Sequence, residues 1–482
     1  MSERYEDGHV DGGAEQAAQV DPRTPRPGPR VARFVRGHAG KLVAGCGAVV
    51  MLAVLGVVAV QAEEVRPCWS DFHSLTDTEV FPDAFGVPQI GGTDNPAIRA
   101  ALGDPLYREA TRFTGDQAVG KPVWTVVAQG PLPVMSDEFG LLPARGGAAP
   151  RDLAMYEGRS GKRHWMRTAE GPLDTFMKNL RSLTFVPHKN GDTHVMGADA
   201  RSGYAQWCQA VPVTPAVADP ERDRGWVTGM TGNGGTVLMV GTAPGGRPDT
   251  SRVAQQDTVS GGIARRWDVP GRWTDVAADG RTVYLAAPGA LAAFAPGAAR
   301  PTWKAELPDT AGTVGFAAVT PDRILAGSRP ADGGPGTLTA FDHGGRPVWT
   351  LRGTDPDDVT VTGDTVLAHE TRASADGVAA YRLKDGTPLW FRAVPGLARL
   401  ADGGTDGTTL YLPGGNGLRV LRIADGHVVP STLTVPVDRV FLTGQRIVVE
   451  HTASAKSAWS VAYSTPQAPA DASGSDGDPR RR

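Results

Sequence analysis

The chain has 482 residues, of which 40% are hydrophobic, 7% aromatic and 21% charged. This apolar content is enough to bury the core of one large repeat domain, although the length would also fit two or three ordinary domains. The formal net charge of −3 argues against a protein whose whole surface binds nucleic acid.

Residues 1–41 predict a disordered cytoplasmic tail that is acidic at first and then basic and proline-rich. The basic residues that precede the next, apolar segment are Arg23, Arg26, Arg30, Arg33, Arg36 and Lys41. Their charge favours contact with anionic lipids of the inner leaflet. Two interpretations stay open: these residues only set the topology, or the tail also docks a cytoplasmic partner.

Residues 42–62 predict a transmembrane helix, because these 21 residues contain no charge and would reach roughly 31 Å as a helix. The positive-inside rule places the N-terminus in the cytoplasm and everything after Glu63 outside the cytoplasmic membrane. Val60-Gln61-Ala62 resembles a signal-peptidase site, so cleavage is the alternative, but the apolar run is longer than that of a usual signal peptide.

One of the three cysteines lies in the predicted transmembrane helix, and the other two lie after it. Cys46 lies in the apolar segment, whereas Cys68 and Cys208 lie on the external, oxidising side, where disulfides persist. We therefore predict a Cys68–Cys208 disulfide, which would stabilise the fold by at most about 5 kcal/mol. Two buried free thiols are the alternative.

A glycine stands four residues before a tryptophan five times, which is more often than chance supplies. The pairs are Gly120 and Trp124, Gly161 and Trp165, Gly203 and Trp207, Gly345 and Trp349, and Gly386 and Trp390. Trp267 and Trp303 continue the series without this glycine, and the turn at Gly426 has no tryptophan after it. The tryptophans from Trp124 to Trp390 are spaced by 41, 42, 60, 36, 46 and 41 residues, a period typical of propeller blades.

Short β-branched or apolar runs, separated by Gly, Asp, Asn and Pro, predict strands and turns throughout this region. A glycine supplies the positive φ of a tight turn. A tryptophan on the returning strand would then wedge between neighbouring blades, so that each repeat is stabilised by the next.

The repeat pattern is a small residue, an aromatic or apolar residue, Asp, two further residues, Ser/Thr/Asp, Gly and then Trp. It resembles the PQQ-like propeller repeat of quinoprotein dehydrogenases and BamB-type assembly lipoproteins, from Trp124 to about Val440. The resemblance implies an all-β fold, a seven- or eight-bladed β-propeller with eight favoured by the count of units. We assign it to residues 63–464, followed by a disordered tail over 465–482.

The chain lacks the chemistry that the resemblance would imply for an enzyme. Quinoprotein alcohol dehydrogenases typically place adjacent cysteines against the quinone and a carboxylate base beside calcium, and this sequence has neither motif. The spacing of His188 and His194 does not suit a zinc site. The spacing of Asp355, Asp357 and Asp358 does not suit a calcium-binding loop. We therefore expect no catalytic residue, no cofactor and no metal.

The sequence predicts a single-pass membrane protein whose propeller binds an envelope protein or cell-wall glycan, not nucleic acid. Three tryptophans outside the repeat register are candidates for ligand contact, with core packing as the alternative: Trp226, Trp273 and Trp459. The bias towards Ala, Gly, Pro and Arg indicates a GC-rich bacterial genome such as that of an actinobacterium. Two other functions stay open, a membrane adaptor acting through its N-terminal tail and a degenerate quinoprotein oxidoreductase.

Overall fold

The structure is a computed structural model of the chain. It describes residues 84–85, 103–128, 141–146, 152–157, 163–168, 174–178, 181–187, 193–199, 205–216, 227, 235–243, 246–247, 249–307, 312–330, 336–354, 356–397, 399–443, 446–454 and 457–466. All of these belong to one compact unit, Gln61–Arg482. The expected tail 1–41, span 42–62 and tail end 467–482 lie outside the described residues. Within the described ranges, no helix is long and apolar enough to cross a bilayer.

The described strands form eight antiparallel sheets, of which seven are runs of consecutive strands and are numbered here in chain order. Sheet 1 comprises β3 (Leu141–Gly146), β4 (Asp152–Glu157) and β5 (Arg163–Thr168). Sheet 2 comprises β6 (Asp174–Lys178), β7 (Arg181–Pro187), β8 (Thr193–Asp199) and β9 (Ala205–Ala210). Sheet 3 comprises β10 (Thr236–Thr242), β11 (Thr250–Asp257) and β12 (Ile263–Pro270).

Sheets 4 to 7 each contain four strands. Sheet 4 comprises β13 (Asp275–Ala278), β14 (Val283–Ala287), β15 (Ala290–Phe294) and β16 (Trp303–Glu306). Sheet 5 comprises β17 (Thr313–Val319), β18 (Ile324–Arg329), β19 (Thr337–Phe341) and β20 (Pro347–Arg352). Sheet 6 comprises β21 (Val359–Thr362), β22 (Thr365–Arg372), β23 (Ala375–Arg382) and β24 (Pro388–Ala393). Sheet 7 comprises β25 (Gly404–Thr405), β26 (Thr409–Leu412), β27 (Arg419–Arg422) and β28 (Val428–Val429).

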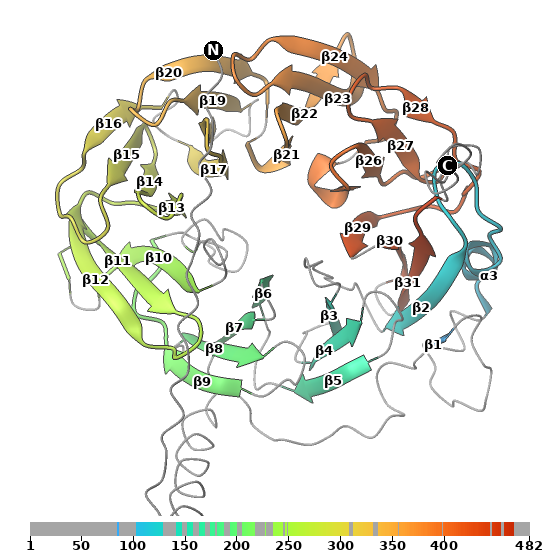
Figure 1. Ribbon diagram of the computed structural model, residues 1–482, viewed down its shortest axis with the longest axis horizontal. Coiled ribbons are helices and arrows are strands. Elements are labelled where there is room, and N and C mark those ends of the chain that lie inside the picture. Colours follow the sequence, from blue (N-terminus) through green and yellow to red (C-terminus); the bar gives the residue numbers. More distant parts are fainter. Residues whose placement is uncertain are drawn as a thin grey trace, which may run out of the picture. The chain divides into compact units, whose positions relative to one another are not determined.

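Successive sheets follow one another around a common centre, with the first strand of each inside and the last outside (Figure 1). Middle strands such as β14 and β19 are wholly buried, and apart from two threonines in β19 and the hydroxyl of Tyr284 in β14 their side chains are apolar, because neighbouring sheets cover both faces. The apolar core therefore lies between sheets. One such cluster joins Leu325 and Leu338 of sheet 5 to Val366 and Ala379 of sheet 6. The prediction of an all-β, propeller-like fold is confirmed.

The eighth sheet, called the closing sheet, combines both ends of the unit. Its strand order is β1 (Ala84–Phe85), β2 (Pro122–Ala128), β31 (Ser457–Ser464), β30 (Arg446–Ser454) and β29 (Arg439–Thr443). Strand β2 pairs antiparallel with β31, so that Thr125 faces Val461 and Val127 faces Trp459. An N-terminal strand thus occupies the outer position that the fourth strand takes in sheets 4 to 7.

A short helix, α3 (Pro105–Thr111), precedes β2 and was not expected from the sequence. Asp104 caps it by accepting a hydrogen bond from Leu106 N at 2.9 Å, and proline suits the first helical turn. The other carboxylate oxygen of Asp104 accepts the indole N–H of Trp459 at 3.1 Å. The helix is thereby attached to the closing sheet.

Asp116, in the loop after α3, fixes this segment to the chain beyond sheet 7. Its Oδ1 accepts the N–H groups of Ala118 and Val119, both at 2.8 Å. Its Oδ2 accepts the N–H of Thr432 at 2.6 Å and the hydroxyl of Ser431 at 3.0 Å. Burial alone would raise the pKa of Asp116, but these hydrogen bonds lower it below its ordinary value. One carboxylate therefore joins residues that are more than 300 positions apart in the sequence.

Candidate functional site

The first and third turns of a four-stranded antiparallel meander lie at the same end of the sheet. We call the end formed by these turns the turn face. In sheet 4 the turns are residues 279–282 and 295–302, and in sheet 5 they are residues 320–323 and 342–346. Gly345 and Gly386 lie in third turns, and Trp349 and Trp390 lie on the strands that follow, so this part of the sequence pattern maps onto the turn face.

Four repeat tryptophans donate their indole N–H to a main-chain carbonyl in the turn that precedes the outer strand of the next sheet. Trp207 binds Thr258 O at 3.1 Å, Trp303 binds His343 O at 2.9 Å, Trp349 binds Leu383 O at 3.0 Å and Trp390 binds Ile423 O at 2.8 Å. The indoles are thus polar links between sheets as well as apolar wedges.

Each of these four indole rings is covered by a glycine with positive φ in the same turn of the next sheet: Gly261, Gly345, Gly386 and Gly426. A Cβ on Gly386 would lie 2.7 Å from Trp349 Cγ, and one on Gly345 would lie 2.5 Å from Trp303 Cε3. The turn glycines therefore supply both a left-handed backbone and room for the ring. Gly345 and Gly386, which stand four residues before Trp349 and Trp390, thus lie against the tryptophan of the preceding unit.

Trp267, on β12, is the exception among the repeat tryptophans whose surroundings are described. Its side chain is 8% exposed, and its indole N–H finds no acceptor among the described residues. The next third turn, residues 295–302, contains Gly297, but nothing lies within 4 Å of a Cβ built there. This seam between sheets 3 and 4 therefore lacks both contacts that the four other tryptophans make.

The remaining repeat residues lie at the N-terminal end of the series. Trp124 is buried on β2, and Gly120 lies against the end of β31, where a Cβ would meet Ser464. Trp165 falls on β5, while Gly161 and Gly203 lie outside the described residues.

The two described candidates for ligand contact, Trp273 and Trp459, do not lie on the surface. Trp273 is 3% exposed, packs edge-on against Phe294 and donates its indole N–H to Pro270 O at 2.9 Å. Trp459 is fully buried and packs edge-on against Tyr107 of α3. The burial of both rings agrees with the alternative of core packing and not with ligand contact. Trp226 lies outside the described residues.

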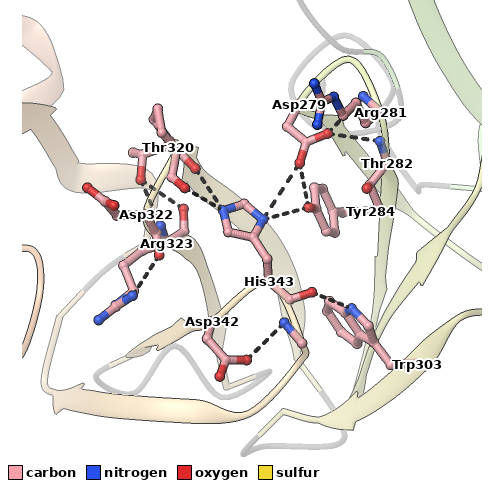
Figure 2. Close-up of polar contacts among 12 residues, drawn as sticks. Asp279, Arg281, Thr282, Tyr284, Trp303, Thr320, Asp322, Arg323, Asp342 and His343 are labelled. Atoms are coloured by element: carbon pink, nitrogen blue, oxygen red, sulfur yellow. Dashed lines mark hydrogen bonds and ion pairs between the residues drawn. The ribbon is translucent and has the colours of Figure 1, made fainter. Parts of the chain in front are cut away.

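A polar cluster around His343 joins the turns of sheets 4 and 5 on the turn face (Figure 2). His343 Nδ1 lies 2.9 Å from the Tyr284 hydroxyl and 3.6 Å from Asp279 Oδ2. The Tyr284 hydroxyl itself donates to Asp279 Oδ2 at 2.8 Å. On the other side of the ring, His343 Nε2 lies 3.1 Å from Thr320 O and 3.0 Å from Pro321 O. From the third turn of sheet 5, this imidazole thus contacts the first turn of sheet 5 and the first turn of sheet 4.

The Asp279 carboxylate is held in its charged form. Its burial raises the pKa, but the N–H groups of Arg281 and Thr282, the Tyr284 hydroxyl and the nearby His343 together lower it below the ordinary value. Burial, followed by the hydrogen bond to Asp279, raises the pKa of the Tyr284 hydroxyl. The tyrosine hydroxyl therefore stays protonated and donates a hydrogen bond to the carboxylate.

Sequence reasoning missed this cluster, although part of it had a signal. Asp279 and Tyr284 belong to the run Asp-Gly-Arg-Thr-Val-Tyr-Leu, which recurs as Asp-Gly-Thr-Thr-Leu-Tyr-Leu from Asp406 to Leu412. In the second copy the Tyr411 hydroxyl again donates to the aspartate, at 3.3 Å. His343 has no such repeat, and its contacts link residues 22 to 64 positions away, so its role follows from the structure alone.

The turn face also carries exposed aliphatic side chains. Within the described ranges, the large hydrophobic residues that are exposed are Val259, Val348, Leu389 and Val428, between 42% and 50%. Val259 lies in the turn between β11 and β12, and the others lie at or directly beside the start of the outer strands of sheets 5, 6 and 7. All four therefore gather at one end of their sheets.

The other predicted site residues are only partly covered. Cys208 lies almost buried on β9, whereas Cys68 lies outside the described residues, so their pairing stays a prediction. The basic residues from Arg23 to Lys41 lie outside the described residues as well. No group of three or more metal-ligand side chains occurs within the described ranges.

Part of the chain matches a known protein family, and several solved structures are similar to it. Residues 287–434 match the family described as outer membrane protein assembly factor BamB. A search of curated proteins found no match. Among solved structures, BamB from Moraxella catarrhalis is 16% identical, with 70% of this chain and 99% of that chain covered and a TM-score of 0.45. Sqt1 from Saccharomyces cerevisiae is 10% identical, with 70% and 100% covered and a TM-score of 0.46. The dihydro-heme d1 dehydrogenase NirN is 12% identical, with 71% and 78% covered and a TM-score of 0.43. The family match covers four third turns of the series, in sheets 4 to 7.

Proposed function

We propose that the protein displays a non-catalytic, eight-bladed propeller outside the cytoplasmic membrane and binds another envelope protein through its turn face. The eight sheets support the blade number, since each would be one blade. The outer strands support it too: seven carry a repeat tryptophan, and in β28 Val429 pairs with Val420 as Trp390 pairs with Ala380.

The observation that carries the binding proposal is the position of the exposed aliphatic residues. Val348, Leu389 and Val428 occupy the start of the outer strand in three consecutive sheets. A polar side chain at each of these exposed positions would stay hydrated and would not reduce the stability of the fold. A run of exposed apolar groups at one repeated position is typical of a protein-binding surface. The description of the matched family as an assembly factor also supports a protein ligand.

Site-specific photo-crosslinking in intact cells tests this proposal. A benzophenone side chain at position 348 or 389 should capture a discrete protein partner. The same probe at Ser374 serves as the control, because this exposed residue lies in the second turn of sheet 6, at the opposite end. Equal capture from Ser374, or crosslinks to peptidoglycan alone, would overturn the proposal and favour the cell-wall glycan.

The membrane anchor belongs to the same proposal and rests on the uncharged segment 42–62 with basic residues before it. Single cysteines introduced at exposed positions of the turn face should react with a membrane-impermeant maleimide in intact cells, whereas one placed in residues 1–41 should not. The reverse labelling pattern would refute the topology. Deleting residues 1–41 while keeping the span separates surface binding from the adaptor alternative, because only the adaptor would lose its activity.

A further inference from the structure

We propose that the seam between sheets 3 and 4 binds a carboxylate-rich segment of a partner protein at the turn face, with Arg265 as its main contact residue. This inference rests on the proposed function and names the chemistry of the partner that the turn face would bind. Three features of the seam carry it: the unpaired indole N–H of Trp267, the main-chain carbonyl that corresponds to its acceptor, and the exposed cations beside them.

The other seams identify the acceptor that Trp267 lacks. In sheets 5, 6 and 7 the indole of the preceding sheet binds the carbonyl of His343, Leu383 or Ile423. Each of these lies three residues after the residue that pairs with the repeat position of the outer strand: Ala340 with Trp349, Ala380 with Trp390 and Val420 with Val429. In sheet 4 Ala293 pairs with Trp303, so the corresponding carbonyl is that of Pro296.

Arg265 occupies this carbonyl instead. Its Nη1 donates to Pro296 O at 3.2 Å. Arg265 and Trp267 lie two positions apart on β12, so both side chains stand on the same face of sheet 3. The Trp267 indole is buried and its N–H finds no acceptor among the described residues, whereas Arg265 is exposed. The seam therefore combines a buried donor without an acceptor and an acceptor held by a surface side chain.

Two further cations lie on the sheet 4 side of this seam. Arg300 is exposed in the turn 295–302, which contains Pro296. Lys304 is exposed on β16 and pairs with Ala292, which belongs to the same apolar cluster as Trp267, so Lys304 lies on the face turned towards sheet 3. Neither these two cations nor Arg265 forms an ion pair with a carboxylate in the part of the chain that the structure describes.

The nearby carboxylates leave an excess of positive charge. Asp268 accepts Arg252 Nε at 2.8 Å and, as the residue directly after Trp267, lies on the opposite face of β12. Asp257 Oδ1 accepts N–H groups of its own turn. Glu306, two positions after Lys304, is exposed on the same face of β16 and offsets only one of the cations.

A carboxylate suits this site better than the carbonyl that Arg265 holds. A guanidinium binds a carboxylate through two parallel, charge-assisted hydrogen bonds, which are stronger than one bond to a neutral carbonyl. A partner's carboxylate that draws Arg265 away would free Pro296 O for the N–H of Trp267, so binding would also satisfy a buried donor. Further carboxylates of the same segment would meet Arg300 and Lys304. The arrangement therefore favours an acidic peptide over a neutral glycan.

Fluorescence anisotropy of the full-length chain with a labelled hexaglutamate peptide tests the site. The wild type should bind hexaglutamate at least about tenfold more tightly than hexaglutamine at the same ionic strength, because charge-assisted hydrogen bonds carry the affinity. Arg265→Met, which keeps the length of the side chain but removes its donors, should weaken hexaglutamate binding at least about fivefold. Arg352→Met is the matched control, because Arg352 is exposed on the outer strand β20 at the end opposite the turn face.

Equal affinities of the wild type and Arg265→Met for hexaglutamate, or of the wild type for the two peptides, would overturn the proposal. The crosslinks from positions 348 and 389 do not involve Arg265. A captured protein together with absent hexaglutamate binding would therefore reject this site and leave the proposed function standing.

A double substitution tests the exchange at Pro296 O without any ligand. In the wild-type background Trp267→Phe should change the melting temperature by less than about 1 °C. In the Arg265→Met background, where the indole can take the carbonyl, Trp267→Phe should lower it by about 2–3 °C. The same effect in both backgrounds would contradict the exchange.

A measurement on the wild type covers the case in which Arg265→Met fails to fold. Nitrogen-15 spectra of tryptophan-labelled protein should contain one indole signal that is missing from Trp267→Phe. This signal should move when hexaglutamate is added and stay in place with hexaglutamine. An unchanged signal at saturating hexaglutamate would refute the coupling between the partner's carboxylate and the Trp267 N–H.

Discussion

Replacing Trp349 and Trp267 separately by phenylalanine tests whether the indole N–H links the sheets. Both residues occupy the same position in the repeat. Trp349 donates to Leu383 O at 3.0 Å, whereas the N–H of Trp267 is buried and finds no acceptor among the described residues. The two substitutions remove the same atoms, so a difference between them reports the hydrogen bond.

The expected magnitudes follow from these surroundings. Trp349→Phe loses a hydrogen bond of about 1 kcal/mol and apolar contacts of about 1–2 kcal/mol, so the free energy of unfolding should fall by about 2–3 kcal/mol. Trp267→Phe loses similar contacts but also removes a buried, unpaired donor, whose desolvation costs about 1–3 kcal/mol. The two terms nearly cancel, so this variant should change stability by less than about 1 kcal/mol.

Differential scanning calorimetry is the suitable assay, because it does not depend on tryptophan fluorescence. For a chain of several hundred residues, 1 kcal/mol corresponds to about 1 °C in melting temperature. Trp349→Phe should therefore melt about 2–3 °C below the wild type and Trp267→Phe within about 1 °C of it. Trp390→Phe, whose indole binds Ile423 O at 2.8 Å, should repeat the larger shift. Equal losses in Trp267→Phe and Trp349→Phe would refute the reasoning.

Two further substitutions and one measurement on the wild-type protein have defined outcomes. Gly386→Ala should destabilise by more than about 2 kcal/mol in a thermal melt because φ is +70° and its Cβ would strike an indole, whereas Gly280→Ala, with φ +89° and open space, should lose only about 1 kcal/mol. Asp116→Asn should lower the melting temperature at neutral pH and make it less dependent on pH. The pKa of Asp116 is lower in the folded state than in the unfolded chain, so the wild-type carboxylate stabilises the fold above the ordinary aspartate pKa. This stabilisation is lost as the pH falls through the folded-state pKa. Non-reducing mass spectrometry should recover the peptides of Cys68 and Cys208 joined, and recovery of unlinked peptides would disprove the disulfide.

The repeat spacing predicted the β-propeller class and where its turns lie, because these follow from local patterns. It did not show which groups meet. Gly386 precedes Trp390 by four residues but covers Trp349, and Gly426 covers Trp390. In the Gly386–Trp390 pair, the glycine therefore contacts the preceding sheet and the tryptophan contacts the next sheet.

Contacts between distant segments could not be predicted in this way. The sequence gives no periodic sign that Asp116 would bind Thr432, since the closing contact occurs once per chain. Trp273 and Trp459 looked available for ligands because they lie outside the repeat register. Their burial depends on the elements that cover them, such as α3 over Trp459, and no pattern along the chain reports that.

The seam at Trp267 shows how one repeat position tolerates a lost polar contact. Its facing turn, residues 295–302, has no glycine against the indole, and Arg265 Nη1 binds Pro296 O at 3.2 Å in that turn. The same seam gains Trp273, which packs on Phe294 and meets its own hydrogen-bonding need at Pro270 O. Apolar contact therefore replaces the indole link here, and because apolar contact is less directional than a hydrogen bond, this seam should respond to packing changes more than to removal of the Trp267 N–H.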